Sequence, residues 1–154
     1  MNALERTAQR VEELLAGMGP AFSKVRDGAY FAKRGSTLVG IRVVPWEGED
    51  DDAAVLISAD VVEGADLTSP ELLVALLEHN DQAAYGAFGV SSEGAITYHH
   101  TLRGSTLGER DLVPAILEVA RVADDWDDRI IAEVGGKTAA ARLREQLGAK
   151  PAGE

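Results

Sequence analysis

The chain has 154 residues, a formal net charge of −11 and no cysteine, and 45% of its residues are hydrophobic. This length and apolar content are typical of one domain with a packed core. The negative charge argues against nucleic acid and anionic membranes as partners, because their phosphates attract lysine and arginine, and the lack of cysteine excludes disulfides, thiol catalysis and cysteine metal sites.

Signals of membrane insertion and export are also missing from the sequence. No run of about 18 apolar residues predicts a membrane-spanning helix. Residues 1–6 lack the basic start and apolar run of a signal peptide. We therefore expect a cytoplasmic protein whose acidity favours solubility and can also attract basic partners.

The first third of the chain predicts one helix and then a small sheet. Asn2–Met18 carries an apolar stripe at helical spacing and is followed by Gly19 and Pro20, which end helices. Three clear strands are expected, at Ala29–Lys33, Thr37–Pro45 and Ala53–Val62. Phe22–Arg26 allows a further short strand.

Alternation along Thr37–Pro45 predicts a strand with two different faces. Val39, Ile41 and Val43 point to one side, and Leu38 and Val44 point to the other.

The segment Glu47–Asp52 holds five acidic residues among its six and predicts a solvated loop between strands. A calcium loop of the EF-hand type that began at Asp50 would need glycine at its sixth position, where the chain has Val55. The sequence therefore predicts no calcium site here.

A well-marked helix follows within Thr68–Phe88. Thr68 or Ser69 is expected to cap it, Pro70 fits its first turn, and Gly86 is expected to end it. One broad face, wide enough to cover a sheet, consists of Leu72, Leu73, Leu76, Leu77 and Asn80.

The remaining segments predict a hairpin and two helices. The hairpin strands are Ala87–Val90 and Ala95–Arg103, and a long helix capped by Asp111 runs to Val134. Thr138–Leu147 is expected to form a short helix, and Pro151–Glu154 a frayed tail.

We therefore predict a main domain over residues 1–136 and a short C-terminal helix with a tail over 137–154. Between Lys137 and Lys150 the chain has four basic residues and one acid. This end could lie against acidic surface of its own chain or of a second subunit, or be loosely ordered.

No catalytic or cofactor motif is complete. His99 and His100 are neighbours in a strand and point to opposite faces, and His79 has no second histidine at helical spacing, so no metal site is expected. Gly135–Thr138 lacks the first glycine of a phosphate loop, and Gly89–Glu93 lacks the last glycine of a nucleophile elbow. We expect no catalytic residues, no cofactor and no metal.

An acidic cluster at Asp124–Asp128 surrounds Trp126 in the long helix. Asp124 and Asp128 share one helix face, and Trp126 can anchor the helix by packing. The cluster is expected to be a solvated face, with a patch for a partner's lysines and arginines as the alternative.

Three groups of residues resemble the YbjN family, which has the type III secretion chaperone-like fold and is often labelled a bacterial sensory transduction regulator. The first runs from Pro70-Glu71-Leu72-Leu73 through Leu76 and Asn80 to Gly86-Ala87-Phe88. The second is Gly94 with Leu102-Arg103-Gly104, and the third is Val119-Ala120 with Ala123-Asp124. The resemblance covers Leu4–Val134, with Leu77 where an asparagine is expected.

The resemblance implies an α+β fold in the order helix, three strands, helix, two strands, helix, with an antiparallel sheet packed against the helices. It also implies a homodimeric, non-enzymatic protein that holds a partner's segment along apolar surface. The candidate partner-binding residues are Leu72, Leu76, Asn80, Tyr85, Phe88, Asp124, Trp126 and Asp128. Filling the core is the alternative role for most of the apolar ones.

Two other functions remain open at this stage. The dimer could act as a signalling or stress regulator that binds a folded partner through its acidic faces. An enzyme would require a deep pocket in which His99 or His100 meets an acid.

Overall fold

The computed structural model describes residues 1–18, 22–48 and 51–148. In chain order the elements are α1 (Ala3–Ala16), β1 (Phe22–Arg26), β2 (Ala29–Arg34), β3 (Thr37–Pro45), β4 (Ala53–Val62), α2 (Pro70–Gln82), β5 (Ala87–Val90), β6 (Ile96–Arg103), α3 (Glu109–Val134) and α4 (Ala139–Gly148). Gly19, Pro20 and the predicted tail Pro151–Glu154 lie outside the described residues.

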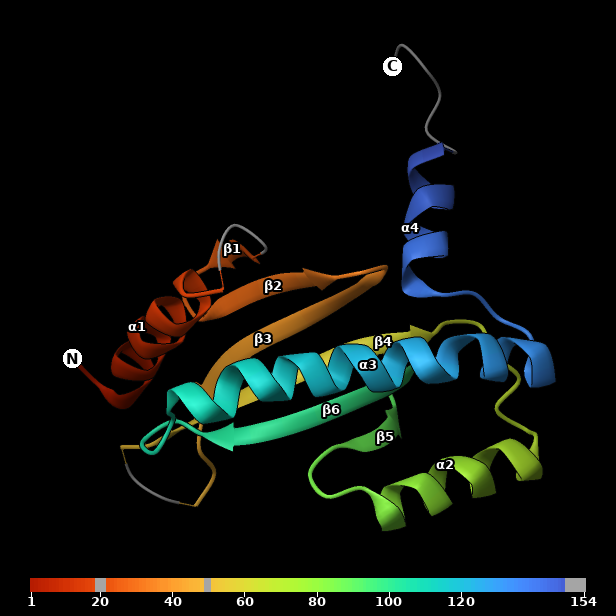
Figure 1. Cartoon of the computed structure of the whole chain (residues 1–154), viewed down its shortest axis with the longest axis horizontal. Helices are drawn as coiled ribbons and strands as arrows, with labels where there is room; N and C mark the ends of the chain where they lie inside the picture. The colour runs from red at the N-terminus through yellow and green to blue at the C-terminus, as the bar shows by residue number, and fades with distance from the viewer. Residues whose placement is uncertain (19–21, 49–50, 149–154) are drawn as a thin grey trace.

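The strands form one antiparallel sheet in the order β1-β2-β3-β4-β6-β5. Helices α1 and α3 pack against one face of this sheet, α2 lies beside the edge strand β5, and α4 follows the C-terminal end of α3 and projects from the body of the molecule (Figure 1). The predicted α+β fold is confirmed. Four strands precede α2 instead of three, because Phe22–Arg26 pairs with β2 across the turn at Gly28, whose φ of 76° suits glycine.

The core lies between the sheet and the layer of α1 and α3. Strand β3 shows the predicted alternation, since Val39 and Ile41 are fully buried whereas Leu38 is 43% exposed. From the helix side, α3 contributes Leu112, Ile116 and Val119, each with no exposed surface. The sheet is therefore buried on one face, as expected for an antiparallel sheet with helices on one side.

The opposite side of the sheet, which we call the open face, is formed by the alternate residues of each strand. Its members include Phe31, Leu38, Gly40, Arg42, Leu56, Ser58, Thr97, His99 and Thr101. One row of paired residues crosses it from Phe31 through Gly40 and Ser58 to His99. Helix α4 contacts β3 and β4 at one end of this side.

Two helix boundaries differ from those expected. Helix α2 is capped by Ser69, whose hydroxyl accepts a hydrogen bond from Leu72 N at 3.3 Å, and it ends at Gln82, before Gly86. Gly86 instead allows a close approach, because a Cβ there would lie 2.4 Å from the Tyr98 ring. In α3 the cap is Gly108, and the carboxylate of Asp111 accepts its N–H at 2.8 Å from inside the first turn.

The expectation that the acidic loop is solvated holds for Asp51, whose side chain is 65% exposed, and is wrong for Asp52. Asp51 pairs with Arg6 at 3.0 Å and accepts the N–H of Ala3 at the start of α1. The side chain of Asp52 is only 9% exposed and lies 2.7 Å from the Nε of Arg103. Glu49 and Asp50 lie outside the described residues. The loop is thus bound to both α1 and β6 by its carboxylates.

Candidate functional site

The open face presents apolar side chains to solvent. Phe31 is 40% exposed and Leu38 is 43% exposed, and Leu56 and Val44 are half-buried on the same side. A Cβ on Gly40 would lie 3.5 Å from Cε1 of Phe31, so the phenyl ring lies over the glycine of the neighbouring strand. Because Gly40 has no side chain, the ring can lie close to the sheet at this point.

One row across the middle of the open face carries small or neutral side chains, and the charged residues Arg42 and Asp60 lie in the rows beside it. Gly40 pairs with Ser58 on β4, and Ser58 pairs with His99 on β6. Thr97 and Thr101 lie on the same side of β6. An extended chain fits such a surface, since its side chains alternate every second residue as those of the sheet do.

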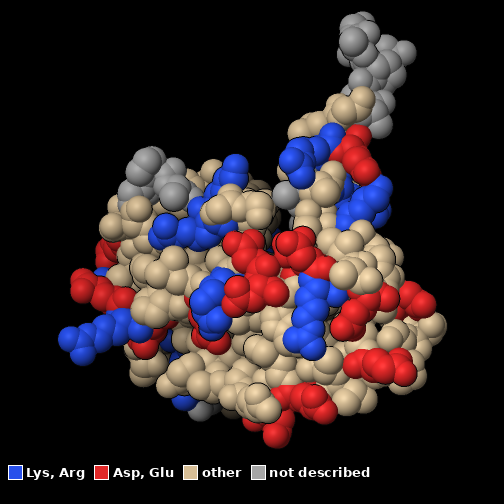
Figure 2. All heavy atoms as spheres, turned by 45° about the vertical axis from the view of Figure 1, so that its right-hand side comes forward, with Lys and Arg blue, Asp and Glu red and all other residues tan. Residues whose placement is uncertain are grey.

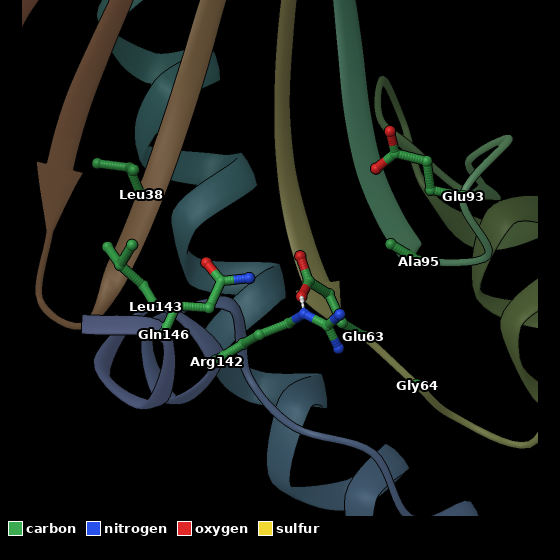
Figure 3. A pocket seen from close by; sticks show the side chains of 8 residues that line it. All are labelled: Leu38, Glu63, Gly64, Glu93, Ala95, Arg142, Leu143 and Gln146. Carbon is green, nitrogen blue, oxygen red and sulfur yellow. Dashed lines mark ion pairs between the residues drawn. The ribbon is translucent and has the colours of Figure 1, made fainter. Parts of the chain in front are cut away.

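Helix α4 forms a wall at one end of the open face. Glu63 and Lys137 exchange two backbone hydrogen bonds of 2.8 Å, and Arg142 Nε lies 2.8 Å from Glu63. These contacts hold the start of α4 against the end of β4. Leu143 then lies near Leu38, and the two line a shared recess (Figure 3).

The edge of the sheet at β5 is closed by α2. The side-chain amide of Asn80 bonds both the N–H and the carbonyl of Phe88, at 2.7 and 3.1 Å. The other edge, β1, has four exposed residues after Phe22. The two edges therefore differ in how they can pair with another chain.

Several predicted partner-binding residues lie in the core. Leu72 is 1% exposed, Leu76 is 5% exposed and Phe88 is 7% exposed. Leu77, by contrast, is 66% exposed, so the expectation that α2 covers the sheet with one broad face is wrong. The helix lies beside β5 and buries only the side that carries Leu72 and Leu76.

Four ring-bearing residues gather where α2, β5, β6 and α3 meet. His79 makes edge-to-face contacts with Phe88, Tyr98 and Trp126, at ring-centroid distances of 5.1, 5.8 and 5.4 Å. The guanidinium of Arg129 lies 4.3 Å from the Trp126 ring centre. Trp126 thus anchors α3 to α2 and β5. Binding of a partner by these residues stays a prediction.

Tyr85 is 76% exposed. Its ring nonetheless stacks on His100, with centroids 5.6 Å apart and planes inclined by 9°. His100 Nδ1 lies 3.5 Å from Glu118, whereas His99 is exposed on the open face. The two histidines are on opposite faces, as predicted. No group of three or more metal-binding side chains occurs in the described part of the chain.

The acidic cluster of α3 serves the fold in part. Asp124 accepts a hydrogen bond of 2.8 Å from the Thr37 hydroxyl and one of 3.4 Å from Ser36, which fixes the β2–β3 turn. Burial raises the pKa of the Asp127 carboxyl. Asp128 is exposed. Acidic side chains are prominent on the body of the molecule, whereas the projecting α4 carries mostly basic ones (Figure 2).

The sequence predicted only some of the apolar residues that are exposed on the open face. Alternation in β3 placed Leu38 and Val44 on a second face, which the structure leaves open. Phe31 belongs to the same face, and the alternation of β2, with Ala32 buried and Phe31 exposed, was the available signal.

Two comparisons connect this geometry to known proteins. The model of a family described as T3SS (YopN, CesT) and YbjN peptide-binding chaperone 1 matches residues 5–142. A chain from a structure titled "Structure of the HopA1-SchA Chaperone-Effector Complex" has a TM-score of 0.54 and 13% sequence identity, over 82% of this chain and 91% of that chain. This likeness shows the fold. No curated protein matches the chain.

Within the described residues, no helix combines the length and apolar character needed to cross a bilayer. The long helix α3 illustrates the point, since its exposed side carries several charged residues, among them Arg121, Asp125 and Arg129.

Proposed function

The chain belongs to the family of type III secretion and YbjN peptide-binding chaperones, and from this premise we propose that it holds an extended segment of a partner protein on the open face of its sheet. The observation that carries the proposal is the one-sided covering of the sheet. Helices pack on one face and bury residues such as Val39 and Ile41 there, whereas the other face keeps Phe31 and Leu38 in solvent.

Apolar contact supplies the affinity for the segment. Phe31 and Leu38 lie on neighbouring strands, so a chain that crosses β2 and β3 meets both. Burying apolar surface stabilises a complex by about 25 cal/mol per Å² before the costs of association. The neutral residues of the middle rows, such as Ser58 and Thr97, offer hydroxyls to the peptide's polar groups.

In this proposal the protein works in the cytoplasm, forms a homodimer and catalyses no reaction. Support for the dimer comes from α2, where Val74 and Leu77 are 52% and 66% exposed and lie one turn apart on the outer side. Val90 of β5 is 51% exposed near the same edge. Exposed aliphatic groups in this arrangement fit a second copy of the chain.

A binding assay with variants of the open face tests the proposal. The probe is an array of short synthetic peptides of graded apolar content. The double variant Phe31→Ser and Leu38→Ser removes the apolar contacts without touching the core, and we expect a loss of most of the binding to apolar peptides. Leu117→Ser is the matched control, because Leu117 is 44% exposed on α3, on the other side of the sheet.

The proposal fails if the double variant binds the array as the unchanged protein does. It also fails if Leu117→Ser reduces binding as strongly, because the helix layer would then be the binding surface. Urea unfolding of each variant shows whether the fold is kept.

A further inference from the structure

Two recesses flank α4 at the end of the open face. The first has a volume of about 480 Å³ and lies between α4, the end of β4 and the β5–β6 turn. The second has a volume of about 520 Å³ and lies between α4 and the β2–β3 turn. Leu38 and Leu143 line both recesses, so they form an apolar ridge between them.

The first recess carries negative charge. Its ionisable residues are Glu63, Glu93 and Arg142, and the arginine is paired with Glu63 at 2.8 Å (Figure 3). Among the described residues, Glu93 has no ion-pair partner. A positively charged group that enters this recess therefore meets a carboxylate that is available for pairing.

The second recess carries positive charge. Lys33 and Arg144 line it together with Gly35, Ser36 and Thr37, and no carboxylate belongs to the lining. Neither cation has an ion-pair partner within the part of the chain that the structure describes. Such a site is unusual in a chain with a net charge of −11, and it favours an anionic group.

We propose that the two recesses bind a segment of the client in which an apolar residue is flanked by one basic and one acidic residue. The apolar side chain lies on the ridge of Leu38 and Leu143, the basic one reaches Glu93, and the acidic one reaches Lys33 and Arg144. The inference rests on the proposed function, since it names the kind of segment that the open face receives at its α4 end.

An extended chain can present three such side chains to one surface. Residues two apart in a strand lie on the same side, about 6.6–6.8 Å from each other. A peptide with Lys-Ser-Leu-Ser-Glu at its centre therefore directs all three recognised side chains toward the protein. A peptide that lies in the opposite direction makes the same contacts if its lysine and glutamate are exchanged. The protein therefore recognises the pattern of one basic, one apolar and one acidic side chain, in either chain direction.

Fluorescence anisotropy with three labelled peptides tests the inference. They share a Ser/Gly background, and their centres are Lys-Ser-Leu-Ser-Glu, Lys-Ser-Leu-Ser-Lys and Glu-Ser-Leu-Ser-Glu. At low salt we expect the mixed peptide to bind roughly fivefold more tightly than either like-charged peptide, which corresponds to the modest strength of exposed ion pairs.

Charge reversal in the protein gives a sharper test, because the preferred peptide changes. With Glu93→Lys both recesses are basic, and the peptide with two glutamates is expected to bind best. With Lys33→Glu and Arg144→Glu both are acidic, and the peptide with two lysines is expected to bind best. Arg110→Glu, an exposed residue outside both recesses, is the control and should leave the preference unchanged.

The experiments distinguish a failure of the charge pattern from a failure of the proposed peptide-binding function. If all three peptides bind equally while binding still depends on Phe31 and Leu38, the charge pattern is refuted and the peptide-binding function stands. Unchanged preferences in the reversed proteins likewise refute the pattern. If neither these peptides nor the array bind, both are overturned.

Discussion

The side-chain amide of Asn80 takes the place of a neighbouring strand for Phe88. Its Oδ1 accepts the Phe88 N–H at 2.7 Å, and its Nδ2 donates to the Phe88 carbonyl at 3.1 Å. A single helical side chain thus satisfies both backbone groups at the centre of the edge strand β5, and it joins α2 to the sheet. Unpaired strand edges promote association with other chains, so this contact also protects the edge.

We expect Asn80→Ala to lower the free energy of unfolding by about 1–3 kcal/mol, because a partly buried N–H and carbonyl lose their partners. Urea unfolding measures this change. Gln82→Ala, on the exposed end of the same helix, is the control and should change stability by less than about 0.5 kcal/mol. Equal stability of the two variants would show that water replaces the amide without cost. We also expect the Asn80 variant to aggregate sooner on heating.

Gly86→Ala should destabilise the protein through a clash. A Cβ at this position would lie 2.4 Å from Cε1 and the hydroxyl oxygen of Tyr98, whose side chain is fully buried. Overpacking of this kind costs about 1–3 kcal/mol. Thermal unfolding measures the loss. Gly148→Ala is the control, since nothing lies within 4 Å of the added carbon, and a similar loss there would argue against the clash.

Asp52 should make stability depend on pH in the acidic range. The Arg103 guanidinium, and then the N–H of Ala53 and the Ser105 donors, hold the pKa of the Asp52 carboxyl well below its usual range. A pKa that is lower in the folded state contributes stability above the ordinary value of about 4, and this stability is lost as pH falls further.

We therefore expect Asp52→Asn to be less stable than the unchanged protein at pH 7 and to lose less stability on acidification below about pH 4. Urea midpoints measured across this range test the expectation. Asp60→Asn, at an exposed position on β4, should follow the unchanged protein. If the urea midpoints of the Asp52 variant and of the unchanged protein fell in parallel with pH, the role of the Arg103 contact would be contradicted.

Leu77→Asp tests the proposed dimer. Leu77 is 66% exposed on the outer side of α2, and a charge buried at an interface without a partner strongly opposes association. We expect the dimer dissociation constant to rise at least about tenfold, a change of about 1.4 kcal/mol, as measured by analytical ultracentrifugation. Leu117→Asp on α3 should leave association unchanged. A monomeric unchanged protein at all concentrations would refute the dimer itself.

Patterns within single elements predicted much of this fold. Period-two alternation separated Val39 and Ile41 from Leu38, and helical spacing placed α1 and α3. The resemblance carried by the segment from Pro70 to Phe88 led to the family, which the match over residues 5–142 confirms.

Features that depend on distant contacts could not be predicted in this way. Whether Leu76 or Leu77 faces the core depends on where β5 lies against α2. Burial of Asp52 requires Arg103, a residue 51 positions away. The recesses beside α4 exist only because Leu143 lies near Leu38, and no local pattern relates those two leucines.

A sheet with a one-sided core divides its strand residues into two groups with different effects on stability. Residues such as Val39 and Ile41 must keep their size and apolar character, because helices α1 and α3 pack on that side of the sheet. Their neighbours Leu38 and Arg42 are exposed and contribute little to the core. Substitutions at every second strand position are therefore expected to change what the open face presents while the core stays packed.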